Sequence, residues 1–129
     1  MTMTLYITAC SKEKKRDRGD LPALERYDCE RIRRVHADAA KQGAAFRVLS
    51  GKFLLLEADA PIPYYDKYLS EREVGFLVRL LARQLNDLKA AKVVFFRAPL
   101  SDDPGQLPYQ DLIVAACYRA DLAIEVATV

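Results

Sequence analysis

Short runs of apolar and β-branched residues alternate with longer segments of mixed polarity along the chain. The runs are bounded by polar clusters and are too short for helices, which is typical of buried strands. They predict strands over residues 4–10, 46–50, 92–96 and 122–127. Residues 51–69 lack such a pattern, and Pro61 and Pro63 favour an irregular connection there.

The most distinct helix of the sequence begins at Ser70. Ser70 and Glu73 have the spacing of a capping box, in which the serine hydroxyl accepts a free backbone amide and the glutamate reaches back. Apolar residues then recur at helical spacing, namely Val74, Leu77, Val78, Leu81, Leu85 and Leu88. The segment therefore predicts an amphipathic helix with one buried face.

Two further segments predict helices with less distinct ends. Apolar positions share one face of a helix between residues 22 and 42, and Gly43 is placed to end it in a left-handed conformation. The start of this helix stays open, because Asp20 and Asp28 are both suitable N-caps. A shorter helix is expected over about residues 109–119, before the last strand.

Strands that alternate with helices favour parallel pairing through right-handed crossovers. We therefore expect an α/β fold, a three-layer sandwich with a mostly parallel sheet of about four strands. A chain of 129 residues has the size of one ordinary domain, and splitting it would leave two undersized cores. We expect a single α/β domain over residues 1–129.

The composition is that of a folded protein, with 51% hydrophobic and 29% charged residues, and it argues against intrinsic disorder. No apolar run approaches the roughly 20 residues that are needed to span a membrane. The first residues, Met1 to Thr4, lack the basic lead and the cleavage site of a signal peptide. We therefore expect no membrane association and a cytoplasmic location.

Cysteine and histidine are too few and too scattered for a structural zinc site. Such a site takes about four ligands, whereas this chain has only Cys10, Cys29, His36 and Cys117. An odd number of cysteines without regular spacing favours reduced thiols in the cytoplasm over disulfides. We expect no metal and no cofactor, and we interpret Cys29 and Cys117 as structural residues within helices.

Charge is distributed unevenly along the chain, although its total is only +2. Residues 1–56 hold 12 of the 20 basic and 7 of the 18 acidic side chains, a balance of +5, and the rest has a balance of −3. The first half is therefore expected to present a basic face to an anion such as a phosphate or a nucleic-acid backbone. The basic loop itself, Lys14 to Arg18, is expected to be solvated, and binding of a phosphate backbone is the alternative for it.

Two polar tripeptides follow the first two predicted strands: Cys10-Ser11-Lys12 and Ser50-Gly51-Lys52. In an open parallel sheet, ligands bind outside the carboxyl ends of the strands, where helix N-termini favour anions. Hydroxyls, a glycine backbone and two ammonium groups suit a phosphate or a carboxylate. We therefore expect ligand contacts from both tripeptides, although neither is a Walker loop or a dinucleotide fingerprint.

These segments resemble motifs of a family of small uncharacterised bacterial and phage domains. The resemblance rests on Cys-Ser-x-x-Lys at 10–14, Ser-Gly-Lys-x-x-Leu-Leu at 50–56 and Pro-Tyr-Tyr-Asp-x-x-Leu at 63–69. Gly51 stands where that family usually has alanine. The first motif is also similar to one in the N-terminal region of archaeosine synthases, which modify tRNA and are related to tRNA-guanine transglycosylases. The resemblance implies a Rossmann-like fold and a nucleoside or nucleotide ligand.

Three further side chains are candidates for the chemistry. Tyr64 or Tyr65 is expected to stack on a base, and Asp66 to act as a general acid or base. The alternative is a rigid turn whose tyrosines pack on the core. Cys10 is a candidate nucleophile, because nearby lysines would lower the pKa of its thiol, but a cysteine at a strand end is also a common core residue.

Two functions of different classes fit these features. The first is an enzyme or small-ligand-binding protein for a phosphate- or carboxylate-bearing, nucleotide-like molecule, with glycosyl transfer or hydrolysis implied by the resemblance. The second is a non-catalytic module that binds nucleic acid or protein through the basic loop 12–18 and the helix face 31–34. The near-neutral total charge favours the first hypothesis.

Overall fold

The computed structural model describes residues 3–129, in which five strands form one sheet in the order β4-β3-β1-β6-β7. β1 pairs in parallel with β3 and with β6, β6 pairs in parallel with β7, and β4 runs antiparallel to β3. The strands of this sheet are β1 (Thr4–Ala9), β3 (Ala45–Ser50), β4 (Leu54–Leu56), β6 (Lys92–Arg97) and β7 (Ala123–Thr128). The expected mixed α/β fold with a mostly parallel sheet is confirmed.

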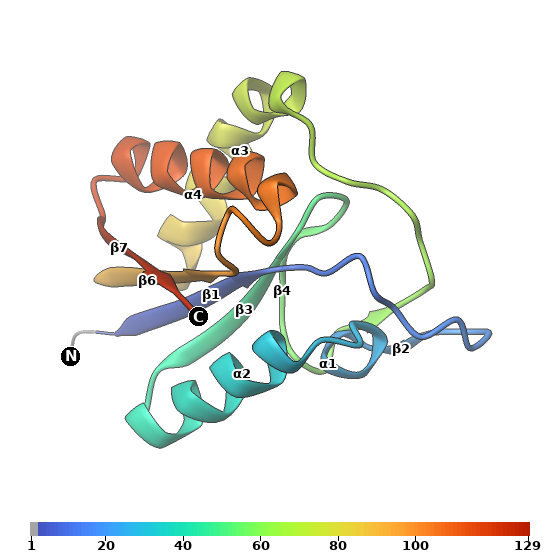
Figure 1. Cartoon of the computed structure of the whole chain (residues 1–129). Coiled ribbons are helices and arrows are strands. Elements are labelled where there is room, and N and C mark those ends of the chain that lie inside the picture. Colours follow the sequence, from blue (N-terminus) through green and yellow to red (C-terminus); the bar gives the residue numbers. More distant parts are fainter. Residues whose placement is uncertain (1–2) are drawn as a thin grey trace.

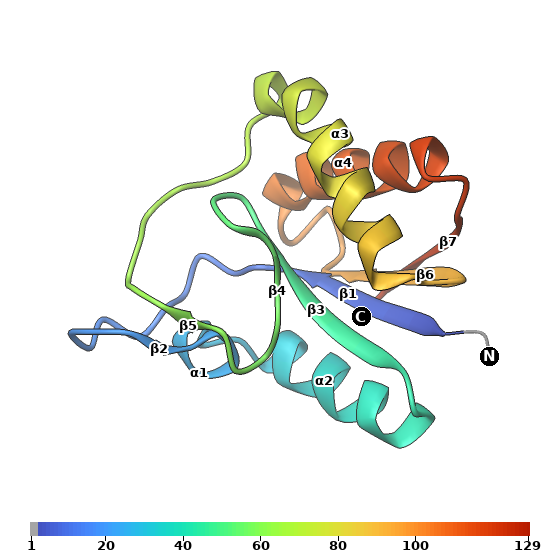
Figure 2. The same ribbon diagram turned by 180° about the vertical axis from the view of Figure 1, so that it is seen from behind.

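Helices lie on both faces of the sheet. They are α1 (Ala23–Arg26), α2 (Glu30–Gln42), α3 (Glu71–Leu88) and α4 (Leu107–Arg119). Figures 1 and 2 place α2 on one face and α3 with α4 on the other. The loop after β1 and the connection from β5 (Pro61–Ile62) to α3 both extend from the end of the sheet where β1 finishes.

The fifth strand lies where the sequence predicted an irregular connection. After Ser50 the chain turns back and pairs β4 with the end of β3, from Ser50 opposite Leu54 to Val48 opposite Leu56. Leu54 has a left-handed backbone with φ 58°, which the sequence does not signal because leucine rarely adopts it. A second small sheet joins β5 to β2 (Leu21–Pro22).

The segment expected to hold one helix between residues 22 and 42 contains two. The single turn α1 stops at Tyr27, whose extended backbone separates it from α2. Neither Asp20 nor Asp28 caps α2, because the N-cap position belongs to Cys29, which therefore precedes the helix instead of lying within it. Gly43 ends α2 with φ 67°, and the capping box of Ser70 and Glu73 begins α3, both as expected.

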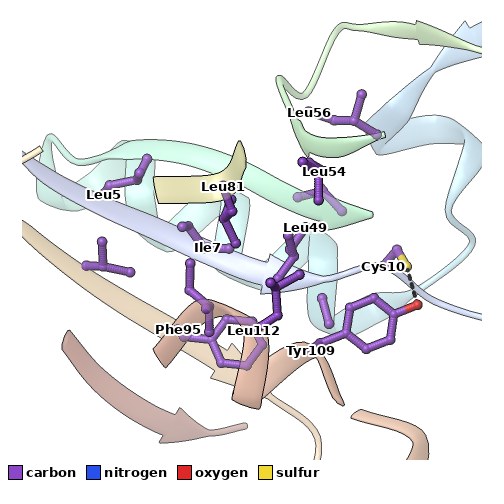
Figure 3. Close-up of a cluster of buried hydrophobic side chains, with 14 of the residues drawn as sticks. Leu5, Ile7, Cys10, Leu49, Leu54, Leu56, Leu81, Phe95, Tyr109 and Leu112 are labelled. Atoms are coloured by element: carbon purple, nitrogen blue, oxygen red, sulfur yellow. Dashed lines mark hydrogen bonds between the residues drawn. The ribbon is translucent and has the colours of Figure 1, made fainter. Parts of the chain in front are cut away.

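The core fills the space between the sheet and its helices. Leu5, Ile7 and Phe95 from β1 and β6 are fully buried and meet Leu81 of α3 and Leu112 of α4 (Figure 3). Burial of this size stabilises a fold by about 1.5–3 kcal/mol for each large side chain. This packing fixes the ends of β1 and β6, and therefore the positions at which the loops after these strands begin.

Within residues 3–129, no helix combines the length and the apolar character that crossing a bilayer requires. Met1 and Thr2, on which the expectation about a leader peptide partly rests, lie outside the described residues.

Candidate ligand-binding site

A cavity of about 360 Å³ opens at the carboxyl ends of β1 and β6. Three segments enclose it: residues 10–12 after β1, residues 68–71 at the start of α3, and residues 103–109 at the start of α4. Its lining is mainly apolar, with a few polar groups from Lys12, Glu71 and other side chains. A concave, mostly apolar site with few polar groups is typical of small-molecule binding.

Cys10 lies on the wall of this cavity and is joined to Tyr109. The thiol of Cys10 donates a hydrogen bond to the Tyr109 hydroxyl at 3.4 Å, as Figure 3 shows. The same hydroxyl accepts the backbone amide of Leu69 at 3.1 Å. Cys10 is only 6% exposed, so it is a buried residue that also contributes to the cavity wall.

Gly51 allows the chain to close around Tyr109. A Cβ atom on Gly51 would lie 2.9 Å from the amide nitrogen of Leu69 and 3.0 Å from the Tyr109 hydroxyl. Both distances are too short for an unstrained contact. The position therefore needs glycine in this chain, because the turn after β3 packs directly behind the cavity wall.

Ser50 lies in the core and makes hydrogen bonds only within the protein. Its hydroxyl oxygen accepts the amides of Lys52 at 3.1 Å and Phe53 at 3.0 Å. Since both lone pairs are used, the hydroxyl must donate its hydrogen to Tyr65, whose oxygen is 2.9 Å away. Ser50 thus holds the turn and the buried tyrosine in place, and it does not line the cavity at the ends of β1 and β6.

Three buried phenols form the polar layer beneath the site. Tyr65 hydrogen-bonds Tyr27 as well as Ser50, and their rings meet edge to face at 6.3 Å. Burial raises the pKa of Tyr27, Tyr65 and Tyr109, and the nearby Cys10 raises it further. The three groups therefore remain neutral hydrogen-bonding phenols at any physiological pH.

The tripeptides and the tyrosine segment contribute differently to the site. Cys10, Ser11 and Lys12 line the cavity, whereas the tripeptide of residues 50–52 does not. Ser11 also donates to the carbonyl of Glu13 at 2.7 Å. Lys52 is exposed, and its ammonium lies 5.3 Å from the centre of the Phe53 ring.

The two adjacent tyrosines point in different directions. Tyr65 is buried on the core, whereas Tyr64 is 39% exposed and lies beneath the Arg16 guanidinium at 5.4 Å. Asp66 is exposed and does not line the cavity, although its carboxylate raises the pKa of Tyr68 and opposes the lowering of the pKa of Lys14 by burial. The structure therefore brings Cys10, Ser11 and Lys12 together with Tyr109, and leaves Tyr64 and Asp66 outside that cavity.

Lys14 is half-buried instead of solvated. Its ammonium lies 4.7 Å from the ring centre of Tyr65 and 5.7 Å from that of Tyr68. Loss of water lowers the pKa of Lys14, against the opposing effects of Cys10, Asp66 and Glu13. Since the sequence placed this residue in a solvated loop, its position among tyrosines could not be anticipated from the charge pattern.

Arg26 fixes the shape of the polar loop after β1. It is fully buried and donates to the carbonyl oxygens of Lys15 at 2.6 Å, Asp17 at 3.0 Å and Gly19 at 2.5 Å. Arg26 also reaches the Ile62 carbonyl at 3.4 Å. A guanidinium has five donors in a planar fork, so one side chain satisfies several carbonyls that the loop would otherwise leave unpaired.

Sequence reasoning missed one side of the cavity. Tyr68, Glu71 and the segment 103–108 line it but were not singled out as site residues. The sequence did contain a signal for the segment 103–108. The predicted strand over residues 92–96 ends shortly before it, and the loop after a parallel strand must leave the same edge of the sheet. Tyr109, at the start of α4, also lines the cavity.

No three Cys, His, Asp or Glu side chains within residues 3–129 lie close enough together to hold a metal ion. Comparison of the chain with protein-family models, with curated proteins and with solved structures finds no match.

Proposed function

We propose that the protein binds a nucleoside or nucleotide in the cavity formed by residues 10–12, 68–71 and 103–109, and acts on it. One observation carries the proposal: the cavity lies at the carboxyl ends of neighbouring parallel strands and is mainly apolar with polar groups at its edge. A planar base suits the apolar walls. The half-exposed ring of Tyr68 provides a stacking surface, and Glu71 and Asp103 provide hydrogen-bond acceptors.

We also propose that the fold is a Rossmann-like three-layer sandwich. In such a fold the position of the cavity supports a nucleotide-like ligand. The parallel order β3-β1-β6-β7 supports that assignment. The helix that follows β1 and the helix that follows β6 lie on opposite faces, so the crevice between these strands is a topological switch point. Ligands of doubly wound sheets bind at such points.

Cys10 is the nucleophile that this proposal assigns, with glycosyl transfer or hydrolysis as the reaction class. Its thiol is on the cavity wall and is oriented by Tyr109. The general acid or base is Glu71 or Asp103 in this proposal, because both carboxylates line the cavity whereas that of Asp66 does not. The three free thiols of the chain support a reducing compartment, the cytoplasm.

Thermal shift with the common nucleosides and nucleoside monophosphates tests the proposal. A ligand at a hundredfold excess over its Kd stabilises the folded protein by about 2.7 kcal/mol, which raises Tm measurably. The Tyr68→Ala variant should lose most of this shift, because it removes the stacking surface. The matched control is Tyr118→Ala, which removes an 89% exposed tyrosine on α4 that does not line the cavity. Equal shifts in the two variants, or none for any ligand, would contradict the proposal.

The alternative hypothesis is a module that binds nucleic acid or protein through the basic loop 12–18 and the helix face 31–34. Part of that helix face is already engaged in contacts within the protein. Arg31 donates to Thr8 and to the Ala9 carbonyl at 2.8 Å, and Arg33 pairs with Glu30 at 3.3 Å. Of the basic helix face 31–34, only Arg34 is therefore without a hydrogen bond or an ion pair in the described part of the chain. The small-ligand hypothesis is the better supported of the two.

A further inference from the structure

A second cleft, of about 370 Å³, lies next to the cavity. It is more open and more polar than the first, and it is lined by Lys12, Glu13, Lys14, Arg16, Asp28 and Tyr64. Lys12 lines both spaces, so the two adjoin at this side chain. The pair therefore offers an apolar compartment that is joined to a charged one.

The charges of this second cleft are predominantly positive. Lys12, Lys14 and Arg16 alternate along one segment, and Lys14 pairs with Tyr27 as in an antiparallel strand. All three side chains line the same cleft, which brings these cations together. Of the two acids, Asp28 already pairs with Arg33 at 3.5 Å. Glu13 is thus the one lining carboxylate without an ion pair in residues 3–129.

None of the three cations has a carboxylate partner in the part of the chain that the structure describes. Each instead lies over an aromatic face: Lys12 is 5.8 Å from the Tyr68 ring centre, Lys14 is 4.7 Å from Tyr65, and Arg16 is 5.4 Å from Tyr64. A cation–π contact holds a cation without neutralising it. Three oriented positive charges thus remain available to an anion.

The backbone that carries these cations is already ordered. Arg26 clamps the carbonyls of Lys15, Asp17 and Gly19, and the amide of Lys15 donates to the Arg26 carbonyl at 2.9 Å. The amide of Asp28 donates to the Glu13 carbonyl at 3.0 Å. A preorganised loop loses little conformational entropy when a ligand binds, so its charges contribute more of their attraction to affinity.

We propose that the charged cleft is the phosphate subsite of the cavity, so that the ligand is a phosphorylated nucleoside. Its ring occupies the apolar compartment, Lys12 lies at the junction, and the phosphate contacts Lys14 and Arg16. This inference rests on the proposed function and names its ligand class. Lys14 is half-buried and forms no ion pair with a carboxylate in the described residues, so a phosphate would give this cation a direct partner.

Paired ligands test the subsite. The affinities of the four common ribonucleosides and of their 5′-monophosphates are measured by calorimetry with the wild-type protein. A monophosphate should bind at least about tenfold more tightly than its nucleoside, since charge-assisted hydrogen bonds to a phosphate are among the strong ones. The double variant Lys14→Gln/Arg16→Gln should remove this difference and leave nucleoside affinity unchanged. Arg16→Gln alone should remove part of it, and it avoids any effect of Lys14 on folding.

The matched control is Lys15→Gln/Arg18→Gln, which removes the same charge from the same loop at two exposed positions outside both spaces. It should leave the preference for monophosphates intact. If both double variants lost the preference for monophosphates equally, the subsite would be overturned, because the preference would then depend on the total charge of the loop and not on Lys14 and Arg16. Equal binding of nucleoside and monophosphate by the wild-type protein would overturn the subsite but not the proposed function. If the wild-type protein bound neither nucleosides nor monophosphates, both the subsite and the proposed function would be overturned.

Discussion

The hydroxyl of Tyr109 is hydrogen-bonded both to the thiol of Cys10 and to the backbone amide of Leu69. One side chain of α4 thereby connects the end of β1 with the segment that precedes α3, and these are the three elements around the cavity. The connection makes the cavity wall depend on contacts between residues that are 99 and 40 positions apart in the sequence.

Tyr109→Phe should therefore lower the free energy of unfolding by about 1–3 kcal/mol, because it leaves a buried amide without an acceptor. Urea denaturation measures the change. The control is Tyr118→Phe, which alters an 89% exposed hydroxyl and should change stability by less than about 0.5 kcal/mol. Equal stability of the two variants would mean that the Leu69 amide finds another partner.

Gly51→Ala should also destabilise the protein. The new methyl group would meet the Leu69 amide nitrogen at 2.9 Å and the Tyr109 hydroxyl at 3.0 Å, so the wall must move. Overpacking of this kind costs about 1–3 kcal/mol. Gly75→Ala is the matched control, because Gly75 is exposed in α3 with open space around it, and alanine there should stabilise by up to about 1 kcal/mol. Denaturation curves that shift in the same direction for both would refute the steric argument.

The parts of the fold that local patterns determine could be predicted from the sequence. The buried runs gave the four parallel strands to within one or two residues, and the capping box at Ser70 gave the start of α3. The strand β4 was missed because it depends on the left-handed backbone of Leu54 and on pairing with β3. Neither of these leaves a pattern among residues 51–69.

The residues that line the cavity could be predicted only where topology decides their position. Cys10, Ser11 and Lys12 line the cavity because they follow a central parallel strand. Ser50 also follows such a strand, but the turn into β4 directs its hydroxyl to two backbone amides and to the distant Tyr65. Which of the polar residues at a strand end remain free is thus settled by tertiary contacts.

Arg26 should be among the charged side chains to which stability is most sensitive. Arg26→Met leaves several loop carbonyls unpaired and should cost at least about 2 kcal/mol. Arg26→Lys should restore little, because a single ammonium cannot reproduce the planar fork. Limited proteolysis should also show faster cleavage within residues 12–20. The control Arg34→Met changes an exposed position of α2. If Arg26→Lys were as stable as the wild type, the fork geometry would be unimportant.

Stability should decline at alkaline pH because of the buried phenols. The pKa values of Tyr27, Tyr65 and Tyr109 are raised in the folded protein by burial, above the ordinary value of 10.0. Below pH 10 these phenols are protonated in both states, so they add no pH dependence. Above it the unfolded chain loses protons that the folded chain keeps, and each phenol then lowers the free energy of unfolding by about 1.4 kcal/mol per pH unit.

Urea denaturation at a series of pH values measures this decline, and ultraviolet difference absorbance counts the phenols that ionise. Three of the seven tyrosines should stay protonated until the protein unfolds. Cys117, whose pKa burial raises to about 12, should begin to add to the decline from about pH 9, the ordinary value for a thiol. Tyr65→Phe should make the alkaline slope shallower, because it removes one of the three groups. A folded protein in which all seven tyrosines ionise together near pH 10 would contradict the buried phenol layer, since a phenol that ionises at its ordinary pKa must be in contact with water.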